Sequence, residues 1–236
     1  MPLMLRFFRG EGTERLDRVG EQVQEMLARD RKEFDLAMSA LLGEVSWDSV
    51  NDELRGLDRE VNQLEREIRQ QLLVHASVFG AIETPSVLVH MSVVKDIERV
   101  GDYAKNLLDL ARDGASFAGL PNEAEWRILW WREVAEFITQ SAEAFGKGDG
   151  GQCRSMLLRG DEILDLCDAR VTALVRGEDT DPQPVARSLA LRYLKRVVAH
   201  IMNLLSAVVM PFDQLDYFDE DPEDRRDRQA RERQGK

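Results

Sequence analysis

The chain has few of the side chains on which most enzyme chemistry depends, with two cysteines and three histidines among 236 residues. It contains no Cys-x-x-Cys pair, no Glu-x-x-His pair, no glycine-rich phosphate loop and no nucleophile elbow. These absences argue against dithiol redox sites, diiron-carboxylate bundles, P-loop nucleotide sites and α/β-hydrolases. We therefore expect no enzyme and no catalytic residue, and we expect His75, His90 and His200 to be structural or surface residues.

The two cysteines are not expected to form a disulfide. Cys153 and Cys167 are fourteen residues apart in one expected helix. A rise of about 1.5 Å per residue separates them by about 21 Å, whereas a disulfide needs Cα atoms within about 7 Å. Both are expected to be small core residues.

Long apolar runs and an excess of positive charge are also missing. No segment reaches the roughly 18–20 apolar residues of a transmembrane helix, and the apolar residues 1–9 lack the cleavage site of a signal peptide. Acidic residues outnumber basic ones by 44 to 32, which gives a net charge of −12. Binding to nucleic acid requires basic residues, so we expect no such partner. The expected location is the cytoplasm, either free or peripheral at the inner face of the membrane.

Apolar residues instead recur at helical spacing, and no segment alternates with the period of two that is typical of strands. The expected helices span residues 13–42, 46–79, 85–113, 123–145, 152–175 and 184–210. The second has the clearest register, with steps of four or three residues between Val50, Leu54, Leu57, Val61, Leu64, Ile68 and Leu72. The sequence therefore predicts an all-α protein built from near-parallel packed helices.

Three oxygen-bearing side chains form one row on the helix expected over 85–113. Glu98, Asp102 and Asn106 follow at steps of four residues. Gly101 lies between the two carboxylates, where a glycine costs ~1 kcal/mol relative to alanine, so another group is expected to approach the backbone closely. A bound cation would offset the repulsion between the two acids.

The same row also fits a simpler interpretation. Lys95 and Glu98 are three residues apart, as are Arg99 and Asp102, so they can form ion pairs within the helix. Exposed pairs of this kind contribute only about 0.3–0.5 kcal/mol each. A solvated, ion-paired face therefore remains open as an alternative to a metal site.

Residues 96–107 read Asp-Ile-Glu-Arg-Val-Gly-Asp-Tyr-Ala-x-Asn-Leu, and this pattern closely resembles the signature helix of the PhoU family of bacterial phosphate-uptake regulators. The resemblance implies two tandem three-helix bundles and metal bound on acidic helix rows. The chain departs from the fuller family pattern because residues 85–92 lead almost directly into the signature, without an Asp-Leu-Arg segment. We therefore expect a divergent member.

An internal repeat agrees with this architecture. Residues 57–65 match 160–168, and 98–107 match 195–204. We expect a first repeat over 1–114, a linker over 115–122, a second repeat over 123–212 and a charged, disordered tail over 213–236.

The second copy of the motif is degenerate, because Lys195 replaces Glu98 and Ala199 replaces Asp102. An ammonium group has no lone pair for a metal. We therefore expect Lys195 to lie near Asp161 and Asp165 and to form a salt bridge with them in place of a lost metal.

Five positions are carried over by the resemblance as metal ligands of the first repeat. The helices over 46–79 and 85–113 are expected to present them toward each other; they are Asp58, Asn62, Glu98, Asp102 and Asn106. Carboxylate and amide oxygens suit hard cations. Fe, Zn, Mn and Mg are the candidate metals.

The resemblance implies a regulator or accessory protein of phosphate uptake without catalysis of its own. Such a protein binds a membrane phosphate transporter, a sensor histidine kinase or both, and a homodimer is compatible with the long helices. Two alternatives are a structural helical scaffold with ion-paired acidic faces and a metal-dependent hydrolase. The hydrolase would need an open coordination site and a general base, and nothing in the sequence marks either.

The aromatic cluster in the helix over 123–145 gives one further expectation. Trp126 and Trp130 are four residues apart and fit the core face, whereas Trp131 points elsewhere and is a candidate interface residue.

Overall fold

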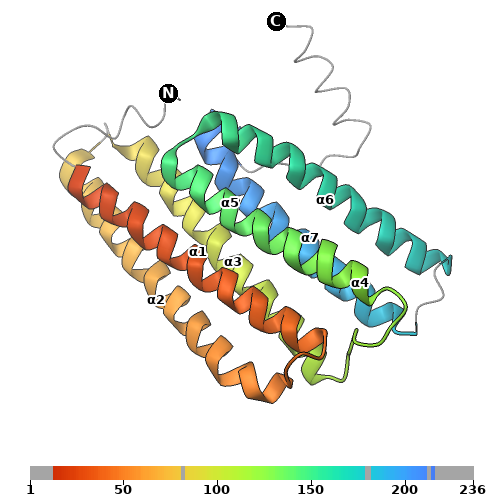
Figure 1. Ribbon diagram of the computed structural model, residues 1–236. Helices are drawn as coiled ribbons and strands as arrows, with labels where there is room; N and C mark the ends of the chain where they lie inside the picture. The colour runs from red at the N-terminus through yellow and green to blue at the C-terminus, as the bar shows by residue number, and fades with distance from the viewer. Residues whose placement is uncertain (1–12, 81–82, 179–181, 212–213, 216–236) are drawn as a thin grey trace, which may run out of the picture.

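The computed structural model describes residues 13–80, 83–178, 182–211 and 214–215, with the backbone alone for residues 13–17 (Figure 1). The apolar residues 1–9, and the tail expected to be disordered apart from residues 214–215, lie outside this part of the chain.

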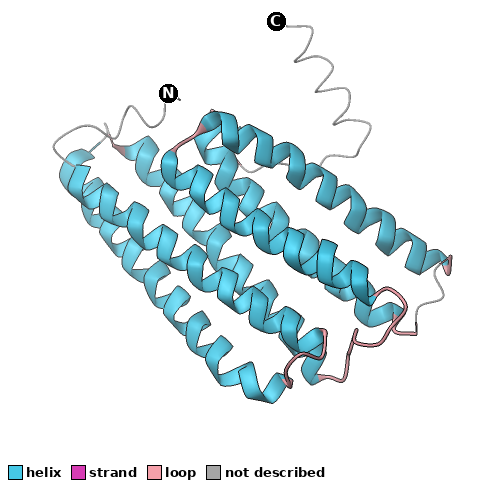
Figure 2. Cartoon of the chain, in the orientation of Figure 1, coloured by secondary structure: helices cyan, strands magenta, loops and turns pink. Residues whose placement is uncertain are grey.

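The described residues are helical and contain no strand, which confirms the all-α prediction (Figure 2). The elements are α1 (Thr13–Leu41), α2 (Trp47–Phe79), α3 (Thr84–Arg112), α4 (Glu123–Glu125), the π-helix η3 (Trp126–Glu133), α5 (Val134–Lys147), α6 (Gly150–Arg176) and α7 (Pro184–Val209). Within the described ranges, none of these helices has the length and apolar content needed to cross a membrane.

The helices form two groups that share one hydrophobic core. Helices α1, α2 and α3 of the first repeat pack on one another, and α5, α6 and α7 form the second group (Figure 1). Helix α3 lies beside α7, and α1 contacts α5, so the two repeats join along their lengths. Buried apolar residues of both groups belong to a single cluster.

Helix ends follow the local chemistry of the chain. Gly148 and Gly177 end α5 and α6 in the left-handed conformation, with φ of 59° and 68°, which glycine adopts without a Cβ clash. The Asp149 carboxylate caps α6 by accepting hydrogen bonds from the backbone N–H groups of Gly151 and Gln152, both at 3.0 Å. Prolines at the first turns of α3 and α7 set where these helices begin.

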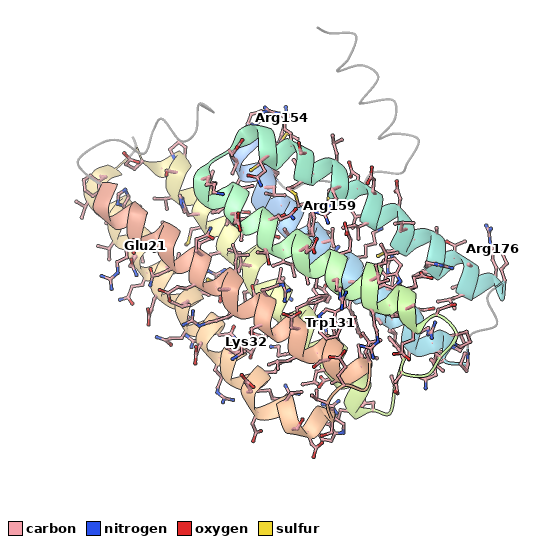
Figure 3. The ribbon with its side chains drawn as sticks, in the orientation of Figure 1. Glu21, Lys32, Trp131, Arg154, Arg159 and Arg176 are labelled. Atoms are coloured by element: carbon pink, nitrogen blue, oxygen red, sulfur yellow. The ribbon has the colours of Figure 1, made fainter. Side chains whose placement is uncertain are left out.

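The helix expected over 123–145 contains a π-helical stretch that its sequence did not indicate. Trp126 and Trp130 are buried in the core, as expected. Trp131 lies between this helix and α1 (Figure 3), and its indole N–H donates to Asp35 Oδ1 at 2.6 Å. The residue expected to mark an interface therefore joins the two repeats within the chain.

Both cysteines are free and buried on α6, as expected. Burial raises the pKa of the Cys153 thiol to about 11 and that of Cys167 to about 12. Neither thiol is therefore ionised near neutral pH, which agrees with a role in packing.

Candidate functional site

The acidic row of α3 faces two further carboxylates that come from α1. Asp30 and Glu33 are both fully buried, at 0% exposure. A Cβ atom added to Gly101 would lie 3.0 Å from Asp30 Oδ1 and 3.4 Å from Glu33 Oε2. The glycine therefore lets the α1 carboxylates reach the backbone of α3 between Glu98 and Asp102. The close approach expected at Gly101 is confirmed, whereas the approaching residues were not predicted.

The two α1 carboxylates have no hydrogen-bond partner in the part of the chain that the structure describes. All four of their oxygens are buried without a donor among the described residues. Burial raises the pKa of Asp30 well above its usual value, and the negative charges of Glu33, Asp58, Glu98 and Asp102 raise it further. Burial also raises the pKa of Glu33 to about 8, with Asp58 and Asp102 adding to the rise and Lys105 opposing it.

A lysine links two of the predicted metal ligands. The Nζ atom of Lys105 lies 2.6 Å from Asp58 Oδ1 on α2 and 2.8 Å from Asp102 Oδ1 on α3. Burial alone would lower the pKa of Lys105, but its hydrogen bonds to Asp102 and Asp58 raise it overall. The structure therefore brings Asp58 and Asp102 together, as expected, around an ammonium group.

Glu98 takes part in the ion pairs that formed the alternative interpretation. Lys95 Nζ lies 2.8 Å from Glu98 Oε2, and Arg99 lies 3.5 Å from Asp102 Oδ2. Both pairs expected within the helix are present. They involve half-exposed basic side chains, so solvent reduces what they contribute to stability.

The two predicted asparagine ligands are half-buried and lie outside these contacts. Asn62 on α2 and Asn106 on α3 make no side-chain hydrogen bond within the described part of the chain. With the side chains as they stand, no group of three His, Cys, Asp or Glu residues in the described ranges could hold a metal ion. The carboxylates share one region of the bundle without forming a coordination shell.

The donor set nevertheless fits a hard cation. Four buried carboxylate oxygens lack any partner, the glycine leaves a cradle that a Cβ would fill, and the surrounding acids are oxygen donors without a thiol. Lys105 and Lys95 pair with the acids of α2 and α3, whereas no basic group of the described residues contacts the oxygens of Asp30 and Glu33. A cation that drew these oxygens inward would supply positive charge there.

The corresponding position of the second repeat, on α7, carries a basic residue where the first repeat has an acid. Lys195 is buried on α7, and its Nζ lies 2.7 Å from Asp168 Oδ2 on α6. Lys195 therefore forms a salt bridge with α6, as expected of its position, but the partner Asp168 was not predicted. In the second repeat the lysine therefore occupies the position that Glu98 has in the first.

A polar contact that the sequence did not reveal joins the two repeats. Asp96 on α3 accepts a hydrogen bond from Asn203 Nδ2 at 2.9 Å and lies 2.7 Å from His200 Nδ1, both on α7. The ring of Tyr103 stacks on His200 with centroids 5.7 Å apart. The expectation of a structural role for His200 agrees with this position.

Comparisons with known proteins connect this site to a family. The PhoU domain family model matches residues 16–111, which include the whole acidic cluster. A phosphate-specific transport system accessory protein PhoU homolog from Deinococcus radiodurans is 28% identical over 195 residues, covering 78% of this chain and 87% of the relative. A protein of the same description from Synechocystis is 24% identical over 200 residues, covering 82% and 87%.

Solved structures show the same fold. PhoU from Pseudomonas aeruginosa superposes with a TM-score of 0.70 at 23% identity, over 83% of this chain and 96% of that one. The phosphate transport system regulatory protein PhoU from Streptococcus pneumoniae gives 0.65 at 17% identity, over 86% and 98%. Residues 16–111 thus match the PhoU domain model, and the fold of the chain is similar to that of the PhoU structures.

Proposed function

We propose that the protein is an accessory or regulatory protein of phosphate transport that acts by binding a partner. The observation that carries this proposal is the PhoU domain over residues 16–111, together with similarity to accessory proteins over 87% of their length. These relatives are named for a role in a transport system. The chain also lacks the motifs of a catalyst.

The partner in this proposal is a membrane phosphate transporter, a sensor histidine kinase or both. The protein would dock from the cytoplasmic side, at the inner face of the membrane, as a helical bundle or as a homodimer of bundles. The long bundle offers extended helix faces for such contacts (Figure 1). No chemical step is required of the protein itself.

A bound metal ion would bias this docking. The five positions carried over from the family are proposed to hold it; they are Asp58, Asn62, Glu98, Asp102 and Asn106. Their oxygen donors favour Mg²⁺, Mn²⁺ or Fe²⁺ over Zn²⁺, which prefers thiolate and imidazole ligands. When bound, the metal would supply positive charge to the acidic cluster.

One observation favours the scaffold as a second candidate. Lys105 already neutralises part of the charge of Asp58 and Asp102, and Lys95 pairs with Glu98. In a scaffold these pairs would be the whole function of the acidic row. Metal analysis of untagged protein separates the two candidates, because a scaffold would purify without stoichiometric metal.

The role itself is tested by deleting the gene and measuring uptake of radioactive phosphate at high and low external phosphate. If the protein is a regulator, the deletion strain should show altered phosphate uptake at high external phosphate. The wild-type gene should restore normal uptake. Affinity purification from detergent-solubilised membranes should then recover a transporter or kinase subunit. Unchanged uptake at both concentrations, with no such subunit recovered, would contradict the proposal.

A further inference from the structure

The α1 carboxylates are not explained by the positions carried over from the family, which all lie on α2 and α3. Asp30 and Glu33 are fully buried, and no donor reaches their four oxygens within the described ranges. Buried polar groups are almost always hydrogen-bonded, and buried charges are almost always paired or bound to a metal. Two such residues side by side on one helix indicate that a further component belongs there.

We propose that Asp30 and Glu33 are the inner ligands of a divalent cation in the first repeat, and that this cation displaces the Lys105 ammonium group from Asp58 and Asp102. This deepens the metal-dependent form of the proposed function and rests on it. It adds a third helix to the site and assigns Lys105 the role of a competitor for the cation.

The position of Gly101 supports ligation from the α1 side. A Cβ at residue 101 would lie 3.0 Å from Asp30 Oδ1 and 3.4 Å from Glu33 Oε2, so the glycine leaves room at the point where the two carboxylates arrive. Glu98 and Asp102 flank this glycine on the same helix. A cation near Gly101 would therefore meet carboxylates from α1 and from α3.

The charge balance supports displacement of the lysine. Asp30 is influenced by the charges of four other carboxylates, those of Glu33, Asp58, Glu98 and Asp102. Lys105 contacts Asp58 and Asp102 and forms no ion pair with Asp30 or Glu33. Lys105 lowers the pKa of Glu33 through space, but within the described residues no basic group contacts the oxygens of Asp30 or Glu33. A divalent cation can neutralise the carboxylates of α1 as well as those of α2 and α3, and it repels the ammonium group.

The experiment titrates purified full-length protein with Mn²⁺, a hard cation that suits carboxylate ligands. Free Mn²⁺ is measured by electron paramagnetic resonance, and the melting temperature is recorded with Mn²⁺ and with EDTA. The variants are Asp30→Asn/Glu33→Gln, Glu33→Gln alone and Lys105→Met. Glu25→Gln is the matched control, because Glu25 lies on the same helix and its side chain is 56% exposed.

We expect wild-type protein to bind Mn²⁺ and to melt at a higher temperature when it is present. The double variant should lose at least about tenfold in Mn²⁺ affinity and melt at a higher temperature than wild type in EDTA. Lys105→Met should bind Mn²⁺ more tightly than wild type, and the control should match wild type. Glu33→Gln alone should fall between wild type and the double variant, which keeps the test valid if the double variant misfolds.

If the double variant binds Mn²⁺ as tightly as wild type, the assignment of the α1 ligands is wrong. If the double variant does not fold, the same result for Glu33→Gln alone would overturn the assignment. Unchanged affinity in Lys105→Met would overturn its role as a competitor. Wild-type protein that binds no Mn²⁺ would overturn the whole inference. Phosphate uptake in the deletion strain would still decide the proposed function separately.

Discussion

The two repeats share one architecture but differ in the residues at corresponding positions of their helices. In the first, Gly101 leaves room for the carboxylates of Asp30 and Glu33. In the second, the aligned position is Val198, which is fully buried, and Lys195 pairs with Asp168 nearby. The bundle therefore folds around apolar packing and a salt bridge at this place. The buried acids of the first repeat are not a requirement of the fold.

The second repeat also uses a glycine for close helix approach, with an apolar neighbour. A Cβ at Gly160 would lie 2.5 Å from the Met202 sulfur atom, so the α7 methionine occupies the space that the α6 glycine leaves. Such contacts gain dispersion energy. Unpartnered buried carboxylates instead lower stability. This difference agrees with the proposal that the acids of the first repeat bind a cation.

Among the proposed variants, the largest effect is expected from replacing the titratable carboxyl group of Glu33, which lies close to Gly101, where the second repeat has Val198. Burial raises the pKa of Glu33 to about 8 in the folded chain, against about 4.3 when unfolded. Between these values the folded state holds a proton that the unfolded state has lost, so stability from this group falls as the pH rises. Urea unfolding in EDTA at a series of pH values should show that Glu33→Gln removes a decrease of roughly 3–5 kcal/mol between about pH 4 and pH 8.

The exposed acid Glu25 is again the control, because Glu25→Gln should leave the pH dependence unchanged. Its side chain is 56% exposed and pairs with Arg29 on the same helix. If Glu33→Gln and wild type lose stability in parallel over this pH range, the Glu33 carboxyl does not hold a proton in the fold. Burial of the Glu33 carboxyl would then not account for a difference in stability between the two repeats.

The helices of both repeats could be predicted because their periodicity is strong and local. The register of α2 was clear in the sequence, and Val50, Leu54, Val61, Ile68 and Leu72 are buried in the structure. Gly101 indicated a close approach on α3 because a mid-helix glycine is costly. The π-helix of residues 126–133 had no comparable local signal.

The inner half of the site could not be predicted in the same way. Asp30 and Glu33 belong to an uninterrupted charged run, Arg29 to Glu33, which is typical of a solvated helix face. One signal was available, because Asp30 lies four residues from both Met26 and Phe34, which are core residues. Deciding between core and surface for such an acid requires knowing which face of α1 meets α3, and this depends on tertiary packing.

A further test of the comparison places the residue of the second repeat at the corresponding position of the first. Gly101→Val introduces the residue that the second repeat has at position 198, and its side chain must displace the carboxylates of Asp30 and Glu33. Overpacking of this kind costs typically 1–3 kcal/mol. Urea unfolding at neutral pH, with EDTA, should show a loss of this size.

The matched control is another helical glycine with open space around it. A Cβ at Gly20 on α1 would meet no atom within 4 Å, so Gly20→Ala should stabilise the protein by about 0.5–1 kcal/mol. If Gly101→Val is equally well tolerated, the α1 carboxylates do not depend on the space at this glycine.

The two lysines provide the smallest expected effects. The Lys195 side chain is 7% exposed but that of its partner Asp168 is 46% exposed, so solvent screens the hydrogen bond that Lys195→Met removes and the cost should be about 1 kcal/mol. The Lys105 side chain is 20% exposed, so solvent screens the repulsion that Lys105→Met leaves between Asp58 and Asp102, and the cost in EDTA should be about 1 kcal/mol.

Chemical unfolding with and without Mn²⁺ measures the stability of both lysine variants. Mn²⁺ should restore Lys105→Met and leave Lys195→Met unchanged, because within the described residues the pair of fully buried carboxylates without a donor lies in the first repeat. Equal rescue of the two variants would show that the repeats do not differ in their capacity for a cation.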